Sequence, residues 1–137
     1  MKNIATIWLL IILFSALMSV GCASISKDIS HTKNLVIKRV GTQWTTISAV
    51  SVVQEGNKTK VRGEVRRRTH SRGPIGGHTD IKVVGPEGTI LEEQSVKHHK
   101  KSIKARHADF VFELKTEPPM GSVIQITHHA PLSTGQF

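Results

Sequence analysis

The segment 108–115 reads Ala-Asp-Phe-Val-Phe-Glu-Leu-Lys, and apolar residues occupy every second position from Ala108 onward. Side chains of a β-strand point alternately to its two faces, so a period of two places one set in a core and the other in solvent. The intervening residues are charged except for Val111. The pattern predicts a strand with one buried face, and it makes Phe110 and Phe112 candidate core residues.

Period-two alternation recurs nearer the N-terminus. In 61–68, Val and Gly alternate with Arg and Glu, and in 80–83 Asp and Lys alternate with Ile and Val. Further runs of strand length are rich in the β-branched residues that strands favour, and these runs are 34–40, 46–54, 89–96 and 122–127. Turn residues separate the runs at 55–57, 85–88 and 116–121. Seven strands and no need for a helix of normal length predict an all-β domain.

This series of short strands with turn signals between them resembles the immunoglobulin and fibronectin-III families. The resemblance implies one antiparallel two-sheet β-sandwich of about seven strands. The Cys pair of true immunoglobulin domains is missing, because the chain has one Cys. Trp44 directly precedes a predicted strand, and we expect its large side chain to lie in the core, with an exposed edge position as the alternative.

The first 22 residues have the features of a bacterial export signal. Lys2 is followed by an uncharged run at 4–20, and small residues end this run just before Cys22, the one Cys of the chain. The run is close to the shortest that spans a bilayer, so a retained anchor is one alternative. Cleavage behind Ala23 with plain secretion is another.

The sequence Ser-Val-Gly-Cys at 19–22 resembles the lipobox of bacterial lipoproteins, although Ser19 stands where Leu is usual. The resemblance implies that residues 1–21 are removed and that Cys22 becomes the fatty-acylated first residue. Because Ala23 rather than Asp follows, it also implies attachment to the outer membrane, facing the periplasm. We expect a lipoprotein signal peptide at 1–21, a lipidated N-terminus and tether at 22–33, the β-sandwich domain at 34–130 and a C-terminal tail at 131–137.

Several function classes lack the residues that they need. The Gly-rich stretch 73–77 does not lead from a strand into a helix, and no Gly-x-Ser-x-Gly motif occurs. Adjacent Glu92 and Glu93 would point to opposite faces of a strand, so they make no acid/base pair. One Cys excludes a disulfide framework and a cysteine-based zinc site. We expect no enzyme, no small-molecule substrate and, because the chain is exported and poor in aromatics, no nucleic-acid partner.

The chain is basic, with 19 Lys and Arg against 10 Asp and Glu and a formal charge of +9. Losing Lys2 with the signal leaves +8. Such a domain attracts acidic envelope proteins and anionic envelope surfaces, and it could dock through basic loops or a strand edge. The candidate binding residues are Arg62, Arg66, Arg68, Lys97, Lys100, Lys101, Lys104 and Arg106.

Eight His suggest an alternative function. His78 and Asp80 share one face of a predicted strand, where an imidazole and a carboxylate can bind Cu(II), Zn(II) or Ni(II). Nearby Lys and Arg repel a cation, which favours a plain basic surface instead. The candidate metal ligands are His70, His78, Asp80, His98, His99 and His107. The sequence therefore predicts a membrane-anchored, non-catalytic binding or envelope-assembly module without a cofactor, with a periplasmic metal-binding protein as the alternative.

Overall fold

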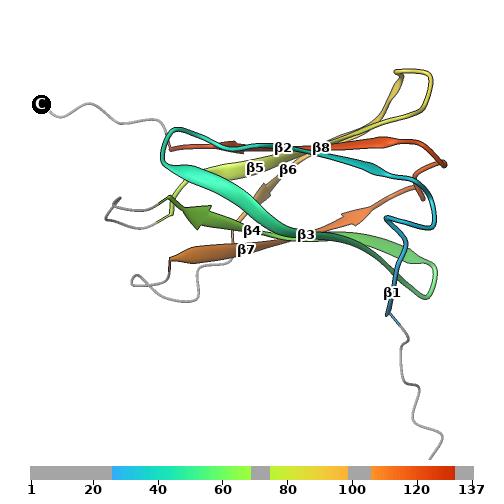
Figure 1. The fold of residues 1–137 in the computed structure, drawn as a ribbon, viewed down its shortest axis with the longest axis horizontal. Coiled ribbons are helices and arrows are strands. Elements are labelled where there is room, and N and C mark those ends of the chain that lie inside the picture. The colour runs from blue at the N-terminus through green and yellow to red at the C-terminus, as the bar shows by residue number, and fades with distance from the viewer. Residues whose placement is uncertain (1–25, 69–74, 99–105, 132–137) are drawn as a thin grey trace, which may run out of the picture.

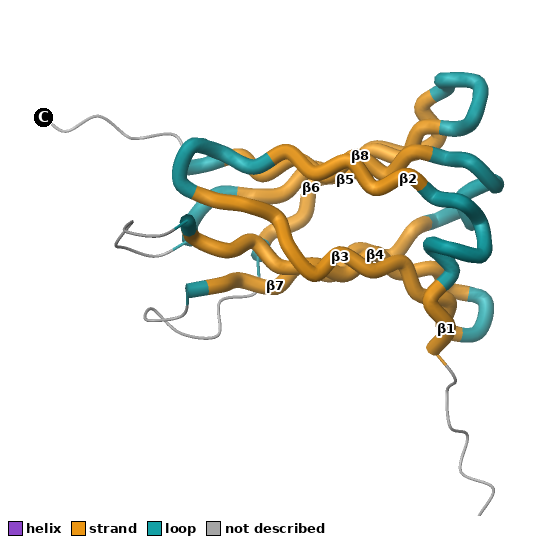
Figure 2. Tube along the Cα trace, viewed as in Figure 1, coloured by secondary structure: helices purple, strands orange, loops and turns teal. Residues whose placement is uncertain are grey.

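The computed structural model describes residues 26–68, 75–98 and 106–131, which form two four-stranded sheets packed face to face (Figure 1). The strand orders are β1-β3-β4-β7 and β2-β8-β5-β6. The strands are β1 (Ser26–Asp28), β2 (Val36–Val40), β3 (Thr45–Glu55), β4 (Lys58–Arg67), β5 (His78–Val84), β6 (Ile90–Lys97), β7 (His107–Leu114) and β8 (Val123–His129). Loops join them, and the described residues contain no helix that could span a membrane (Figure 2). The predicted all-β sandwich is confirmed.

The core lies between the sheets and follows the predicted alternation. Phe110 and Phe112 of β7 are 0% and 3% exposed, and they lie in one buried cluster with the inward residues of β5 and β8. On β4 the inward residues include Gly63, which lies directly against the ring of Phe110. Burial of the fourteen aliphatic and aromatic side chains of this cluster is the main stabilising contribution in such a domain.

Part of the predicted tether belongs to the domain. Ser26–Asp28 forms β1, which pairs with the end of β3, and Ile29 is 6% exposed within the core cluster. The backbone N–H of Ile29 also donates to the carbonyl of Val52, at 2.9 Å. The prediction of a tether is therefore wrong for these residues. A three-residue strand and one apolar side chain in a polar segment make no recognisable pattern in the sequence. Residues 1–25 and 132–137 lie outside the described residues, and with them the predicted signal peptide, Cys22 and most of the predicted tail.

One strand pair is parallel, where the sequence predicted an antiparallel sandwich. β2 pairs in parallel with β8, and Val36 lies opposite Val123. The chain crosses from β1 to the other sheet through a turn, and the N–H of Val36 then donates to the carbonyl of Ser122 at 3.0 Å. Both strands therefore start at the same end of the sandwich and run in the same direction.

Trp44 is 59% exposed, so its predicted place in the core is wrong. The residue that turns inward here is the next one, Thr45, which is 6% exposed and begins β3. A strand alternates strictly, so an inward Thr45 forces its neighbour outward. Trp44 therefore lies on the surface at one end of the sandwich.

The strand ends divide the molecule into two ends of different character (Figure 1). At the histidine end, β5 begins at His78 and β8 finishes at His129, with the start of β3 close by. At the opposite end, which we call the hairpin end, lie Ser26, the two-residue turn between β3 and β4, and the turn between β5 and β6. Gly56 and Gly88 in these turns have φ of 62° and 84°, which confirms the predicted hairpin positions.

Candidate metal centre

Strand pairing brings histidines together at the histidine end. β5 and β8 are antiparallel neighbours, and their register places His78 opposite His129 and Thr79 opposite His128. The start of β5 can approach the end of β8 closely because Gly77 precedes it. Gly77 has φ of 91°, and a Cβ atom there would lie 1.8 Å from the carbonyl oxygen of His129. A residue with a side chain does not fit this position.

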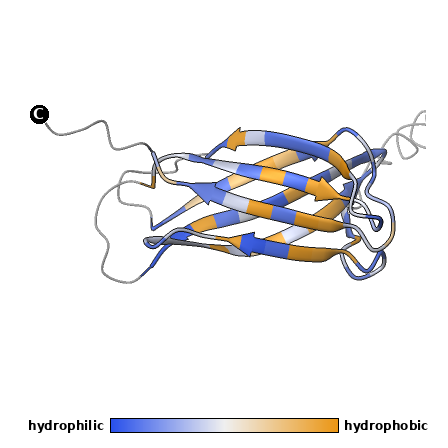
Figure 3. Ribbon diagram, turned by 90° about the horizontal axis from the view of Figure 1, so that it is seen from above, coloured by the Kyte–Doolittle hydropathy of each residue, from blue (hydrophilic) through white to orange (hydrophobic). Residues whose placement is uncertain are grey.

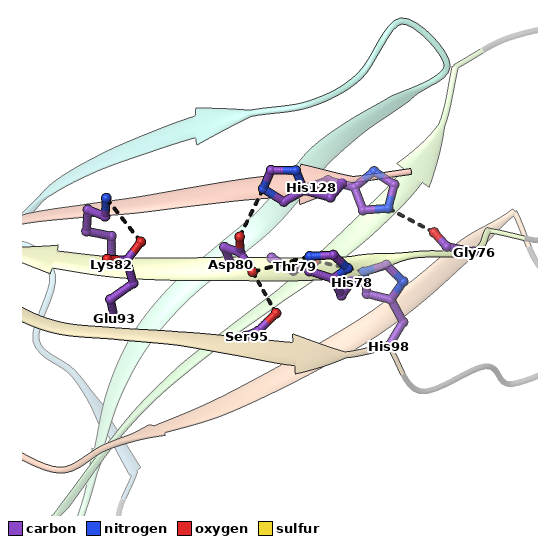
Figure 4. Close-up of polar contacts among 10 residues, drawn as sticks. Gly76, His78, Thr79, Asp80, Lys82, Glu93, Ser95, His98 and His128 are labelled. Atoms are coloured by element: carbon purple, nitrogen blue, oxygen red, sulfur yellow. Dashed lines mark hydrogen bonds and ion pairs between the residues drawn. The ribbon is translucent and has the colours of Figure 1, made fainter. Parts of the chain in front are cut away.

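His78, Asp80 and His129 form a compact group on the outer face of this sheet. The Nε2 atoms of His78 and His129 lie 3.6 and 3.0 Å from the two carboxylate oxygens of Asp80, and all three ligand atoms lie within 4.8 Å of one another. The two imidazole rings are stacked, with centroids 5.0 Å apart. Ser95 of β6 donates a hydrogen bond of 2.6 Å to Asp80 and helps to fix its carboxylate (Figure 4).

These separations fit one transition-metal ion. Metal–nitrogen and metal–oxygen bonds of about 2.1 Å place two ligand atoms roughly 3.0–3.6 Å apart at coordination angles of about 90–120°. The two His–Asp separations of 3.0 and 3.6 Å lie in that range, each measured to a different oxygen of the Asp80 carboxylate. Two imidazoles and a carboxylate suit Zn(II), Cu(II) or Ni(II), and the side chains are 35–46% exposed, so water or a further ligand can complete the coordination.

No protein family, curated protein or solved structure matches this chain.

A second histidine pair lies behind the first, between the sheets. His128 is 3% exposed, and its ring lies 5.0 Å from that of His98, whose Nε2 is 2.8 Å from the hydroxyl of Thr79. Nε2 of His128 lies 3.1 Å from the carbonyl oxygen of Gly76, which can only accept, so Nε2 carries the proton. In the neutral ring Nδ1 then accepts from the hydroxyl of Thr45, at 2.7 Å. His128 thereby ties β8 to β3 in the other sheet.

The pKa of His128 lies below its usual value of 6.5, mainly because the ring is buried. The hydrogen bond to Gly76 raises this pKa, and the positive charges of His129 and His78 lower it. The folded protein therefore binds this proton less readily than the unfolded chain. Stability then falls as the pH drops below about 6.5, because the unfolded state gains the proton first. We expect the urea midpoint to fall between pH 7.5 and pH 5.5, with a smaller fall in His128→Gln.

The matched control for that pH series is His31→Gln, which removes an exposed histidine from the loop between β1 and β2. Its midpoint is expected to follow the wild-type pH dependence. An unchanged pH dependence in His128→Gln would contradict the role of the buried ring.

Another group of possible ligands lies on the other sheet. Glu64 of β4 faces Asp109 of β7 directly, and His107 lies one position further along the same face, all within 4.8 Å. The guanidinium of Arg66 is 3.0 Å from the carboxylate of Glu64 and already supplies a positive charge there. His107 therefore belongs to a different surface from His78, and the prediction that these two share one site is wrong.

The remaining predicted ligands divide into three cases. His78 and Asp80 share one strand face, as predicted, and lie in one group. His98 lies at the same end, against His128 rather than in that group. His70 and His99 fall outside the described residues. His129 was not among the predicted ligands, because its position beside Asp80 depends on the pairing of β5 with β8. The alternation of residues 124–129 does indicate that its side chain faces outward.

The predicted basic residues also separate. Arg62 and Arg66 on β4 are paired with Glu55 and Glu64, and Lys60 shares Glu55, so the charge of that strand face is partly neutralised. At the histidine end, Lys97 lies opposite His78, and Arg106 accepts a backbone hydrogen bond from Arg67 at 3.0 Å. Arg68 lies there as well, with its N–H bonded to the carbonyl of Trp44. Lys100, Lys101 and Lys104 are outside the described residues.

Proposed function

We propose that this protein is a non-catalytic, membrane-anchored domain of the cell envelope that binds one divalent transition-metal ion, Zn(II), Cu(II) or Ni(II), through His78, Asp80 and His129. The observation that carries this proposal is the convergence of two imidazole Nε2 atoms on one carboxylate at 3.0 and 3.6 Å. As a surface ion pair such an arrangement would add little stability, because exposed pairs contribute only about 0–1 kcal/mol. As a ligand set it brings three groups that bind transition metals within 4.8 Å of one another.

Calorimetric titration of the full chain with each metal alone tests the proposal. We expect one ion per chain at neutral pH and loss of uptake on acidification, since imidazoles must be neutral to bind a metal. His129→Ala and His78→Ala each remove a ligand. Loss of a residue that only hydrogen-bonds to a ligand lowers metal affinity by roughly 10–100-fold, so we expect each of these variants to lose more than that.

His31→Ala is the control, since His31 is exposed on the loop between β1 and β2, near the hairpin end. Its metal affinity should equal that of the wild type. Absence of uptake by the wild type, or full uptake by His129→Ala, would rule out this site.

A second candidate function is association with acidic envelope partners or surfaces, and its support is that Arg68, Lys97 and Arg106 gather at the histidine end. Lys100, Lys101 and Lys104 lie in the sequence between His98 and Arg106, both of which are at this end. Exposed charges are screened by salt over about 8 Å at 0.15 M ionic strength. Binding of peptidoglycan fragments that weakens with salt, in the absence of metal uptake, would favour this second function over the first.

A further inference from the structure

A row of apolar side chains crosses the outer face of one sheet at the hairpin end; its two outer members are exposed and its two inner members are half-buried. The strand register places Val36 of β2 beside Val123 of β8, Val123 beside Val84 of β5, and Val84 beside Ile90 of β6. We call these four residues the apolar row. Val36 and Ile90 are 56% and 54% exposed. In Figure 3 the strand ends on the hairpin side are mostly orange, the colour of hydrophobic residues.

The apolar row faces outward rather than into the core. The chain neighbours of Val84 and Val123, which are Val83 and Ile124, are 2% and 0% exposed and belong to the core cluster. Alternation along each strand then directs Val84 and Val123 to the opposite face. Outward β-branched residues paired across four neighbouring strands form one continuous apolar surface, and such surfaces on a small domain indicate a contact with something apolar.

Two further exposed apolar residues extend this surface around the hairpin end. Met120 is 66% exposed and lies in the turn before β8, and Leu91 is 46% exposed beside Gly85. Gly121 lies close to Pro86, so the turn that carries Met120 is next to the turn between β5 and β6, after which Leu91 is the second residue of β6. The next row of the same sheet is polar and contains an ion pair between Lys82 and Glu93, with 3.1 Å between the charged atoms. The apolar surface is therefore confined to the end of the sandwich.

The chain enters the domain at this same end. β1 begins at Ser26, opposite Glu55 and next to the turn between β3 and β4. Cys22 precedes Ser26 by four residues, which span at most about 14 Å when fully extended. A lipid on Cys22 would hold the hairpin end within that distance of a bilayer surface, and a retained anchor at 4–20 would bring the same end to the membrane.

We infer that the apolar row docks the hairpin end onto the lipid bilayer from which the chain is tethered. This inference rests on the membrane attachment in the proposed function and is independent of metal binding. Apolar side chains gain free energy when they enter the boundary between headgroups and acyl chains, and a tether of a few residues keeps them at a high local concentration there. His78 lies on the same face as Val84 but six residues along β5, or about 20 Å, so docking of the hairpin end holds the histidine end about that far from the contact.

Quenching of tryptophan by brominated lipids tests this orientation, and the chain provides its own reference. Trp44 is exposed at the histidine end, and Trp8 is the other Trp of the chain. The full chain is reconstituted into phosphatidylcholine vesicles with and without brominated acyl chains, with Trp8→Phe in every variant. One variant keeps Trp44, and the other carries Trp44→Phe with Ile90→Trp. We expect brominated lipid to remove most of the emission of the Ile90→Trp variant and to leave that of Trp44 unchanged.

Met120→Trp replaces Ile90→Trp as the probe if the latter does not fold, and it should be quenched in the same way. Flotation of the vesicles measures attachment separately from docking. The inference is wrong if the chain floats with the vesicles but the Ile90→Trp probe is not quenched, or if Trp44 is quenched equally. The inference is also wrong if the Ile90→Trp probe is shielded from water but not quenched and the particle has twice the mass of one chain. That result would assign the apolar row to contact with a second copy of the chain. A chain that does not float overturns both the attachment and the docking, while metal uptake would still be measured on its own.

Discussion

Phe110→Ala is expected to lower the free energy of unfolding by about 3–5 kcal/mol, the usual cost of removing a buried Phe ring. The ring is 0% exposed, and it occupies the space that Gly63 leaves on the neighbouring strand, where a Cβ atom would lie 2.4 Å from Cζ of the ring. Because Gly63 has no side chain to move into the gap, the cavity cannot collapse easily. Urea denaturation of the full chain, followed by circular dichroism, measures the loss.

Val111→Ala is the matched control for this change, because it shortens the next residue of the same strand, which is 45% exposed. Its effect should stay within about 0.5 kcal/mol, as for most surface substitutions. If Phe110→Ala prevents folding, Phe110→Leu gives a smaller, measurable loss. Equal effects of Phe110→Ala and Val111→Ala would mean that β7 does not bury the face that carries Phe110.

The strands could be predicted because their patterns are local. The alternation that identifies β7 extends over consecutive residues, and each apolar position in 108–114 is buried except Val111, which was predicted to face solvent. β1 and Trp44 could not be placed by the same reasoning. β1 has three residues and is stabilised by pairing with β3 rather than by its own pattern, and the position of Trp44 depends on which neighbour turns inward at the start of a strand.

Two of the three ligands of the candidate metal centre could be predicted, because their relation is also local. His78 and Asp80 are two residues apart on one strand, so their common face follows from the sequence. His129 is far from them in the sequence and reaches Asp80 only because β5 pairs with β8 in one particular register. His107 is closer in the sequence and lies on the other sheet. Sheet order is set by packing of the whole domain, which no local spacing of histidines reveals.

The arrangement of the two ends also bears on the basic residues. If the apolar row holds the hairpin end at the bilayer, Lys97 and Arg106 are carried away from the headgroups of that bilayer along with the histidines. Their attraction is then directed to anionic groups further from the membrane, such as the carboxylates of peptidoglycan or an acidic partner, since exposed charges act over about 8 Å at physiological salt. Membrane orientation and choice of partner are thus linked.

Gly77→Ala is expected to lower the free energy of unfolding by roughly 2–4 kcal/mol and to weaken metal binding at the same time. A φ of 91° strains any residue that has a Cβ atom, at a cost of about 1–2 kcal/mol. The added Cβ would also lie 1.8 Å from the carbonyl oxygen of His129, which belongs to the backbone of β8 and can move only if the strand moves. Relief of that clash separates His129 from Asp80 and from His78. Denaturation and calorimetric metal titration of the same sample measure both effects.

Gly88→Ala separates backbone strain from the clash. Gly88 has a similar φ of 84°, but a Cβ atom there would meet nothing within 4 Å, and the residue lies in the turn at the hairpin end. It should therefore cost only the strain of about 1–2 kcal/mol and leave the metal affinity unchanged. If Gly77→Ala and Gly88→Ala lose the same stability and both bind metal as the wild type does, the close approach at Gly77 does not hold the two histidine strands together. A selective loss of metal binding in Gly77→Ala would show instead that one glycine, outside the ligand set, sets the distance between the ligands on β5 and the ligand on β8.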